Sequence, residues 1–123
     1  MQPSAELVAF VPSTDLERSR IFYESVLGLT IDEVNPFACV ASSGSSSLRI
    51  TLADGMKPQP FTVLGWVVDD IRGELAELRQ RGVEPLRFAG MDQDDDAVWA
   101  APSGAQVAWF HDPDANVLSL TQL

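Results

Sequence analysis

VAWFHDPDANVLSLT, residues Val107–Thr121, is the stretch that decides the fold. Its two apolar, alternating runs predict strands over Val107–Phe110 and Val117–Thr121. The DPDAN segment between them (112–116) is typical of a turn, because proline presets φ and asparagine tolerates a left-handed backbone. A hairpin alone is only marginally stable, so we expect this one to belong to a larger sheet.

The order of the predicted elements in the first half recurs in the second half, which has one additional strand. The first half predicts a strand at Leu7–Val11 ended by Pro12, a helix at Asp15–Leu27, and strands at Leu29–Val34, Phe37–Ser42 and Leu48–Ala53. The second half predicts a strand at Phe61–Val68, a helix from Asp69 to Gly82, and strands at Val83–Phe88, Ala97–Ala101 and over the closing hairpin. Asp15 precedes Gly28 by the same number of residues as Asp69 precedes Gly82.

An internal repeat of this kind constrains the fold more strongly than any single motif does. Each half has a sheet with one apolar face and one helix to cover it, and neither half buries that face alone. We therefore predict an α+β fold, with βαβββ modules at 5–54 and 61–123, a linker at 55–60, and one domain over 1–123. At the start of the first helix, Thr14 and Glu17 predict a capping box.

The net charge of −10 at pH 7 restricts the partners of the protein. Nucleic acids and anionic membranes need a basic surface, so we expect neither as a partner. An acidic surface keeps a protein soluble, and it is also compatible with a cationic ligand. No apolar run reaches the ~18 residues that a membrane span needs, and the N-terminus lacks the basic start of a signal peptide. The single cysteine, Cys39, lies in an apolar run, which predicts a core residue in a cytoplasmic protein.

Two motifs resemble one known family. The segment DLERSRIFYESVLGL at Asp15–Leu29 resembles the first helix of the vicinal oxygen chelate superfamily, which includes glyoxalase I, bleomycin-resistance proteins and extradiol dioxygenases. The DPDAN segment resembles the family's final turn, with Ala115 where the family usually has glycine. The resemblance covers essentially the whole chain. It implies an open, U-shaped barrel around a cleft and, together with exposed sheet edges, a homodimer.

The enzymes of that family hold a divalent metal with His or Glu on the first and last strands of each module. The matching positions here are Val8, Thr51, Val63 and Ser119. Valine has no lone pair to donate, and neutral hydroxyls are poor ligands for these metals. The single histidine, His111, lies beside the final turn without partners. The hypothesis is therefore a cleft without metal or other cofactor.

Strand alternation predicts which side chains share the cleft. We expect Val8 with Phe10, Arg49 with Thr51, and Trp109 near Ser119 and Val63, with Trp99 close by. The resemblance supports both tryptophans: in the fosfomycin-resistance branch of the family, the position matching Trp109 is an aromatic that contacts the ligand, and the position matching Trp99 lies near the cleft. The alternatives are core packing for the tryptophans and an ion pair for Arg49.

No catalytic set is visible in the sequence. Cys39 and His111 have no evident partners, and Asp32, Glu33 and Glu84 fall on edge-like strands. Asp92–Asp96 has alternating aspartates, as a calcium loop does, but lacks the later glycine and acidic residue, which predicts a solvated loop.

The leading hypothesis for function is metal-free binding or sequestration of a small apolar or aromatic molecule, as in bleomycin-resistance proteins. The acidic charge and Trp109 suit a planar cation. One alternative is a metal-dependent lyase, isomerase or oxygenase. The other is a dimeric scaffold with a vestigial cleft.

Overall fold

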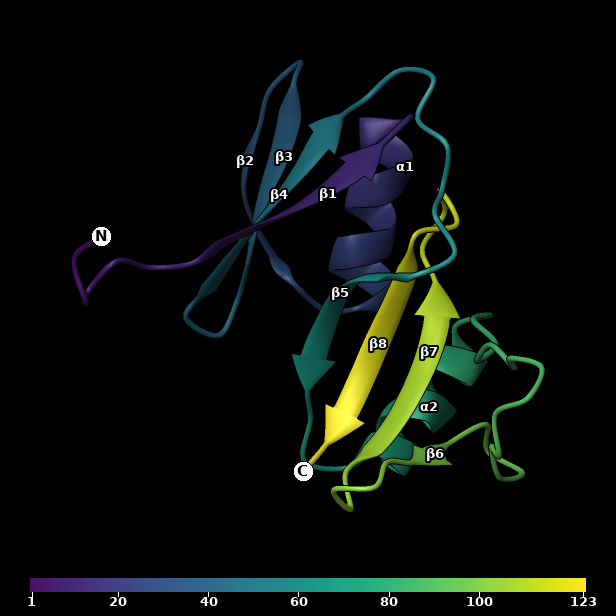
Figure 1. Cartoon of the computed structure of the whole chain (residues 1–123). Coiled ribbons are helices and arrows are strands. Elements are labelled where there is room, and N and C mark those ends of the chain that lie inside the picture. The colour runs from purple at the N-terminus through teal and green to yellow at the C-terminus, as the bar shows by residue number, and fades with distance from the viewer. The chain divides into compact units, whose positions relative to one another are not determined.

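The computed structural model describes residues 1–123, which separate into two compact units (Figure 1). Unit 1 is Met1–Lys57 and unit 2 is Pro58–Leu123. Each unit consists of a four-stranded sheet with helical structure on one face, and the predicted α+β class is confirmed. None of the helices is both long enough and apolar enough to cross a membrane.

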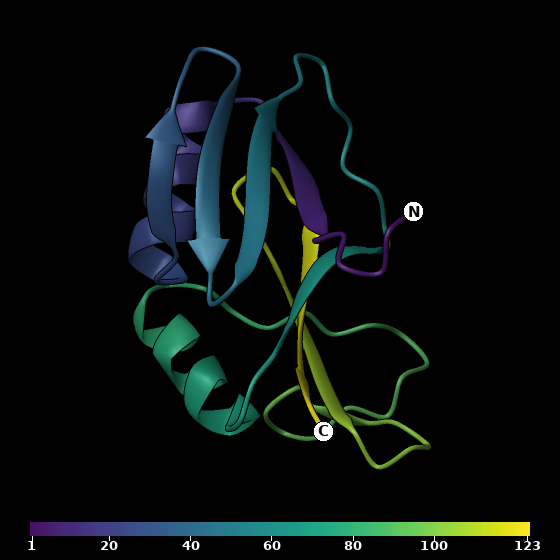
Figure 2. The ribbon, with the colours of Figure 1, turned by 90° about the vertical axis from the view of Figure 1, so that its left-hand side faces the viewer.

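Unit 1 has the element order βαβββ. Its elements are β1 (Val8–Ser13), α1 (Leu16–Ile21) continued by the π-helical turn η1 (Phe22–Val26), β2 (Thr30–Val34), β3 (Ala38–Ser43) and β4 (Ser46–Leu52). The strands lie in the order β1-β4-β3-β2, and β1 pairs with β4 in parallel. Figure 2 shows this sheet face-on, with α1 behind it.

Two predictions at the start of unit 1 are wrong. The first is the capping box: the N-cap of α1 is Asp15, whose Oδ1 accepts a hydrogen bond from Arg18 N at 3.1 Å, and Thr14 Oγ1 instead accepts one from the Arg18 guanidinium. Aspartate is as good an N-cap as threonine, and its charge suits the helix dipole. The second is the end of β1, which continues through Pro12 to Ser13. Because β1 is an edge strand, a residue without an N–H is tolerated there.

Unit 2 repeats the topology of unit 1. Its elements are β5 (Thr62–Val67), α2 (Ile71–Gln80), β6 (Trp99–Ala100), β7 (Gln106–His111) and β8 (Val117–Gln122). The strand order is β5-β8-β7-β6, and β5 pairs with β8 in parallel. Two side chains cap the first turn of α2. Asp70 Oδ1 accepts a hydrogen bond from Gly73 N at 3.1 Å, and Gln122 Oε1 accepts one from Ile71 N at 2.9 Å.

The strand predicted at Val83–Phe88 is not formed, and the strand predicted at Ala97–Ala101 shortens to β6. Two backbone groups of this segment form hydrogen bonds with the side chain of Gln93 instead of with a neighbouring strand. Gln93 Oε1 accepts from Phe88 N at 2.8 Å, and Gln93 Nε2 donates to Leu86 O at 2.9 Å. Leu86 N also donates to Trp109 O on β7 at 2.7 Å. Without the extra strand, unit 2 has the same βαβββ order as unit 1.

The core of each unit lies between its helix and its sheet. The fully buried side chains of unit 1 include Val11, Tyr23, Cys39 and Ile50, and those of unit 2 include Ile71, Leu75, Phe110 and Leu118. Cys39 is thus a core residue as predicted, and burial raises the pKa of its thiol.

The β7–β8 hairpin is present, and its turn contains a strained residue. Ala115 has φ 62°, a left-handed conformation that costs a residue with a Cβ about 1 kcal/mol or more. We expect Ala115→Gly to raise the free energy of unfolding by about 0.5–1 kcal/mol in urea denaturation. The control is Ala105→Gly, which lies before β7 without a positive φ and is expected to destabilise by about 0.5 kcal/mol. Equal effects of the two substitutions would contradict the strain at Ala115.

Candidate functional site

The face of the unit 2 sheet that points away from α2 carries three of the predicted site residues, Trp99, Trp109 and Ser119. Ala108, Phe110, Leu118 and Leu120 are buried on the face covered by α2. The alternate residues form the open face, where the register places Gly65, Ser119 and Trp109 side by side on three adjacent strands. Trp66 pairs with the buried Leu120, so it lies on the opposite face from Trp109.

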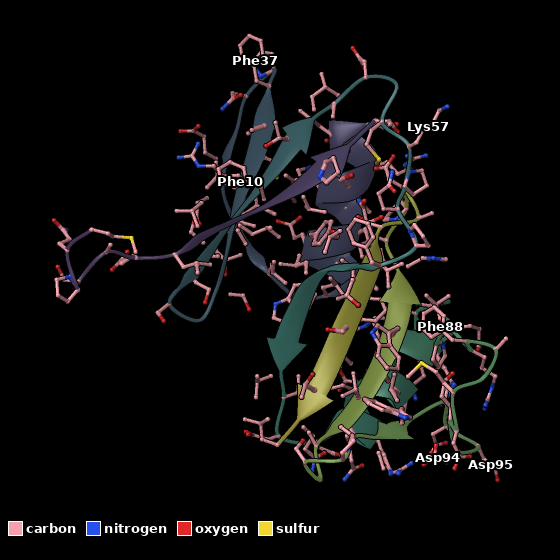
Figure 3. The ribbon with its side chains drawn as sticks, in the orientation of Figure 1. Phe10, Phe37, Lys57, Phe88, Asp94 and Asp95 are labelled. Carbon is pink, nitrogen blue, oxygen red and sulfur yellow. The ribbon has the colours of Figure 1, made fainter.

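Trp109 is held in place from two sides. Its Nε1–H donates a hydrogen bond to Thr62 Oγ1 at 3.0 Å, across the intervening strand β8. Its ring lies edge-to-face with Phe88, at 5.4 Å between centroids, and is tilted against Trp99 at 6.2 Å. Phe88, Trp99 and Trp109 are each partly exposed. We call these three side chains the aromatic wall; Phe88 is labelled in Figure 3.

Gly65 makes room for the hydroxyl of Ser119. A side chain built on Gly65 would overlap Ser119 Oγ, so glycine is the residue that allows this close approach between β5 and β8. Ser119 is partly exposed, and its Oγ lies over the backbone of Gly65. Ser119 therefore offers a partly exposed hydroxyl beside Trp109.

Three residues of this region were not predicted from the sequence, namely Thr62, Phe88 and Gln93. Thr62 lies on the face of Trp109 because the β5–β8 register shifts between Thr62 and Leu64, which makes Val63 the extra residue of an irregular pair. Val63 therefore has no paired residue on β8. The sequence predicts Phe88 in a strand, whereas the side-chain bonds of Gln93 and the hydrogen bond from Leu86 N to Trp109 O hold its segment beside Trp109. No short sequence pattern indicates such bonds.

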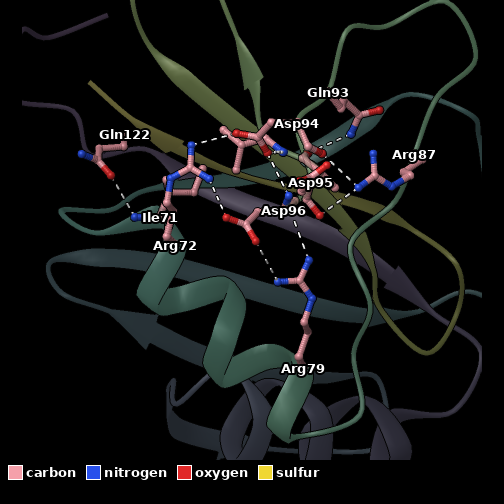
Figure 4. A network of polar contacts seen from close by, with 11 residues as sticks. Ile71, Arg72, Arg79, Arg87, Gln93, Asp94, Asp95, Asp96 and Gln122 are labelled. Carbon is pink, nitrogen blue, oxygen red and sulfur yellow. Dashed lines mark hydrogen bonds and ion pairs between the residues drawn. The ribbon is translucent and has the colours of Figure 1, made fainter.

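The acidic loop behind this region is tied to arginine side chains, as Figure 4 shows. The Arg72 guanidinium donates to Asp94 Oδ2 at 2.8 Å and to Asp96 Oδ2 at 2.6 Å. Arg87 donates to the carbonyls of Asp94 and Asp95. The hydrogen bond from Arg72 holds the pKa of the Asp94 carboxyl below its usual value. The side chains of Asp94 and Asp96 remain 45% and 47% exposed, so the loop is solvated as predicted, and the ion pairs with Arg72 are an addition that the sequence did not indicate.

The open face of the unit 1 sheet carries the other predicted residues. The parallel register places Val8 opposite Ser47, Phe10 opposite Arg49, and Pro12 opposite Thr51. Phe10 is 61% exposed, and Val8 and Arg49 are also exposed. Val8 and Thr51 therefore share a face but do not lie opposite each other.

The side chains at the four family metal positions do not fit a divalent metal ion. Val8 and Val63 provide no donor atom, and Thr51 and Ser119 provide only neutral hydroxyls. Nowhere in the structure do three or more histidine, cysteine, aspartate or glutamate side chains come together as a possible metal site. His111 is exposed at the end of β7, opposite Val117.

Comparisons with known proteins identify relatives of this fold. The family model described as Glyoxalase/Bleomycin resistance protein/Dioxygenase superfamily matches residues 7–120. No curated protein sequence matches the chain. Three similar solved structures differ in their described roles, and all are below 25% identity, so they show the fold alone.

The antibiotic binding protein TnmS3 from Streptomyces sp. CB03234 is 24% identical over 99% of this chain and 98% of its own, with a TM-score of 0.72. The bleomycin resistance determinant encoded on transposon Tn5 is 21% identical over 97% of this chain and 98% of its own, with a TM-score of 0.75. Lactoylglutathione lyase from Agrobacterium tumefaciens is 17% identical over 99% of this chain and 96% of its own, with a TM-score of 0.76.

Proposed function

Because the chain belongs to the glyoxalase/bleomycin resistance protein/dioxygenase superfamily, we propose that it binds a small aromatic molecule on the open face of unit 2, without a metal ion. The observation that carries this proposal is the aromatic wall. Trp109 is fixed by a hydrogen bond to Thr62 and by ring contacts to Phe88 and Trp99, and the three rings stay partly exposed. A rigid aromatic surface binds a flat ligand with little loss of side-chain entropy.

The charge of the chain favours a cationic ligand within this class. The net charge is −10, and an indole face attracts cations through its ring quadrupole. Ser119 adds a hydroxyl near Trp109 that can orient a polar group of the ligand. The aromatic wall and the acidic charge together therefore favour a planar cation as the ligand.

The donor chemistry of the family positions supports binding without metal. Val63 and Ser119 cannot replace the imidazole and carboxylate ligands that a catalytic divalent ion needs. The names of two similar structures, an antibiotic binding protein and a bleomycin resistance determinant, are in line with sequestration. The similar lactoylglutathione lyase defines the competing hypothesis, which is a metal-dependent enzyme.

The test measures the affinity of a panel that contains bleomycin, a planar acridinium cation and neutral naphthalene. Isothermal titration calorimetry gives the affinity, and tryptophan fluorescence provides a second readout. We expect the acridinium ion to bind. Trp109→Ala is expected to lower its affinity about tenfold, because the variant loses one desolvated stacking and cation–π contact. The control Trp66→Phe changes a tryptophan on the opposite face and is expected to leave the affinity unchanged.

Two results would overturn the proposal. One is the absence of binding for the whole panel, and the other is equal affinity of the wild type and Trp109→Ala. Elemental analysis of protein purified without chelator provides an independent check. A stoichiometric first-row metal, removable together with a catalytic activity, would favour the enzyme hypothesis instead.

A further inference from the structure

We propose that the open face of unit 1 is a second binding site, where Arg49 binds the carboxylate of a small molecule whose apolar part lies against Phe10 and Val40. All three residues are neighbours in the sheet. Arg49 on β4 lies opposite Phe10 on β1 and opposite Val40 on β3. The Arg49 guanidinium therefore lies beside two apolar residues in the central part of the face. We call Phe10, Val40 and Arg49 together the strip.

The strip is open to solvent. Phe10 is 61% exposed, Arg49 is exposed, and Val40 is partly exposed. Figure 3 shows Phe10 on the side of the sheet away from α1. An exposed phenylalanine beside an arginine combines an apolar contact surface with a directional anion donor.

Arg49 lacks an ionic partner within unit 1. No hydrogen bond or ion pair from this unit reaches its guanidinium, whereas Arg20 pairs with Glu17 at 2.6 Å and with Glu24 at 2.9 Å. Glu33 belongs to the same face, but its backbone lies two strands, about 10 Å, from the backbone of Arg49. It accepts a hydrogen bond from Asn35 Nδ2 at 2.9 Å. An unpaired guanidinium in a chain with eighteen acidic residues and net charge −10 is thus available to an external anion.

The chemistry of the strip favours a monocarboxylate over other anions. A guanidinium forms two parallel hydrogen bonds with one carboxylate, and it carries a single charge. A doubly charged phosphate would need further cations, and the face offers none beside Arg49. Ser47 and Thr51 flank Arg49 on the same strand and the same face, and their hydroxyls are additional donors for the carboxylate oxygens.

The test compares three probes of the same shape: 2-naphthoate, neutral 2-naphthamide and 2-naphthyl phosphate. Calorimetry gives the affinities, and ¹H–¹⁵N NMR shift changes locate the bound probe on β1, β3 and β4. We expect naphthoate to bind about tenfold more tightly than naphthamide, which is the expected size of one charge-assisted contact. Arg49→Gln should abolish this preference, Arg49→Lys should keep part of it, and Phe10→Ala should weaken both probes.

The control is Arg81→Gln, which changes the net charge equally at the end of α2, where Arg81 lies 4.0 Å from Glu77. This variant is expected to keep the preference for naphthoate. Equal affinities of naphthoate and naphthamide for the wild type would overturn the proposal, and stronger binding of naphthyl phosphate would overturn the choice of a carboxylate.

Sedimentation analysis tests a different occupant of the strip. If Arg49→Gln dissociates a dimer and leaves naphthoate binding unchanged, the guanidinium pairs with a second copy of the chain and the proposal fails. The inference stands apart from the proposal for unit 2, because Trp109→Ala is expected to leave the naphthoate shifts on β1, β3 and β4 in place.

Discussion

Asp112→Ala is expected to lower the free energy of unfolding by about 3 kcal/mol, because several charge-assisted hydrogen bonds lose a buried acceptor. Asp112 is only 5% exposed. Its Oδ1 accepts from Asp114 N at 2.9 Å and from Asn116 N at 3.0 Å, and its Oδ2 accepts from Asn116 Nδ2 at 2.8 Å. The carboxylate thus fixes the turn that joins β7 to β8, the two inner strands of the unit 2 sheet.

Urea denaturation at neutral pH measures this effect. The matched control is Asp95→Ala, which removes the same charge from an exposed loop residue and is expected to change stability by less than about 0.5 kcal/mol. A loss below about 1 kcal/mol for Asp112→Ala would mean that the turn keeps its structure without the carboxylate.

Gln93→Ala is expected to have the second largest effect, about 2 kcal/mol, because three backbone groups lose a part-buried partner. The Gln93 amide bonds Phe88 N, Leu86 O and Ala97 O at 2.8–2.9 Å. These bonds hold the segment that places the Phe88 ring against Trp109. We therefore expect the same variant to weaken acridinium binding severalfold, under conditions where the protein stays folded.

The control for this second prediction is Gln80→Ala, at the exposed end of α2, which should leave both stability and affinity nearly unchanged. Denaturant titration reports stability, and calorimetry reports affinity. If Gln93→Ala loses stability but binds acridinium as the wild type does, Phe88 has no part in the aromatic wall.

Sequence reasoning succeeds where local chemistry decides the structure. Strand alternation correctly places Phe10 and Arg49 on one face of unit 1, and Trp109 and Ser119 on one face of unit 2. The DPDAN segment forms the predicted turn, because proline and the aspartate side chain fix its backbone locally.

It fails where contacts distant in the sequence decide. The segment Val83–Phe88 has the composition of a strand, but its backbone groups form hydrogen bonds with the Gln93 side chain. The irregular pairing at Val63 and the attachment of Asp94 to Arg72 also depend on residues that alternation does not connect.

The parallel pairing of the first and last strand in each unit has a consequence for the order in which the protein is built. During synthesis from the N-terminus, every strand of the unit 1 sheet exists before Pro58 is added, so this sheet can close early. The unit 2 sheet differs, because β8 is made last and yet lies between β5 and β7. Until β8 emerges, β5 has no ladder partner within its unit, and its free edge is open to pairing with other chains.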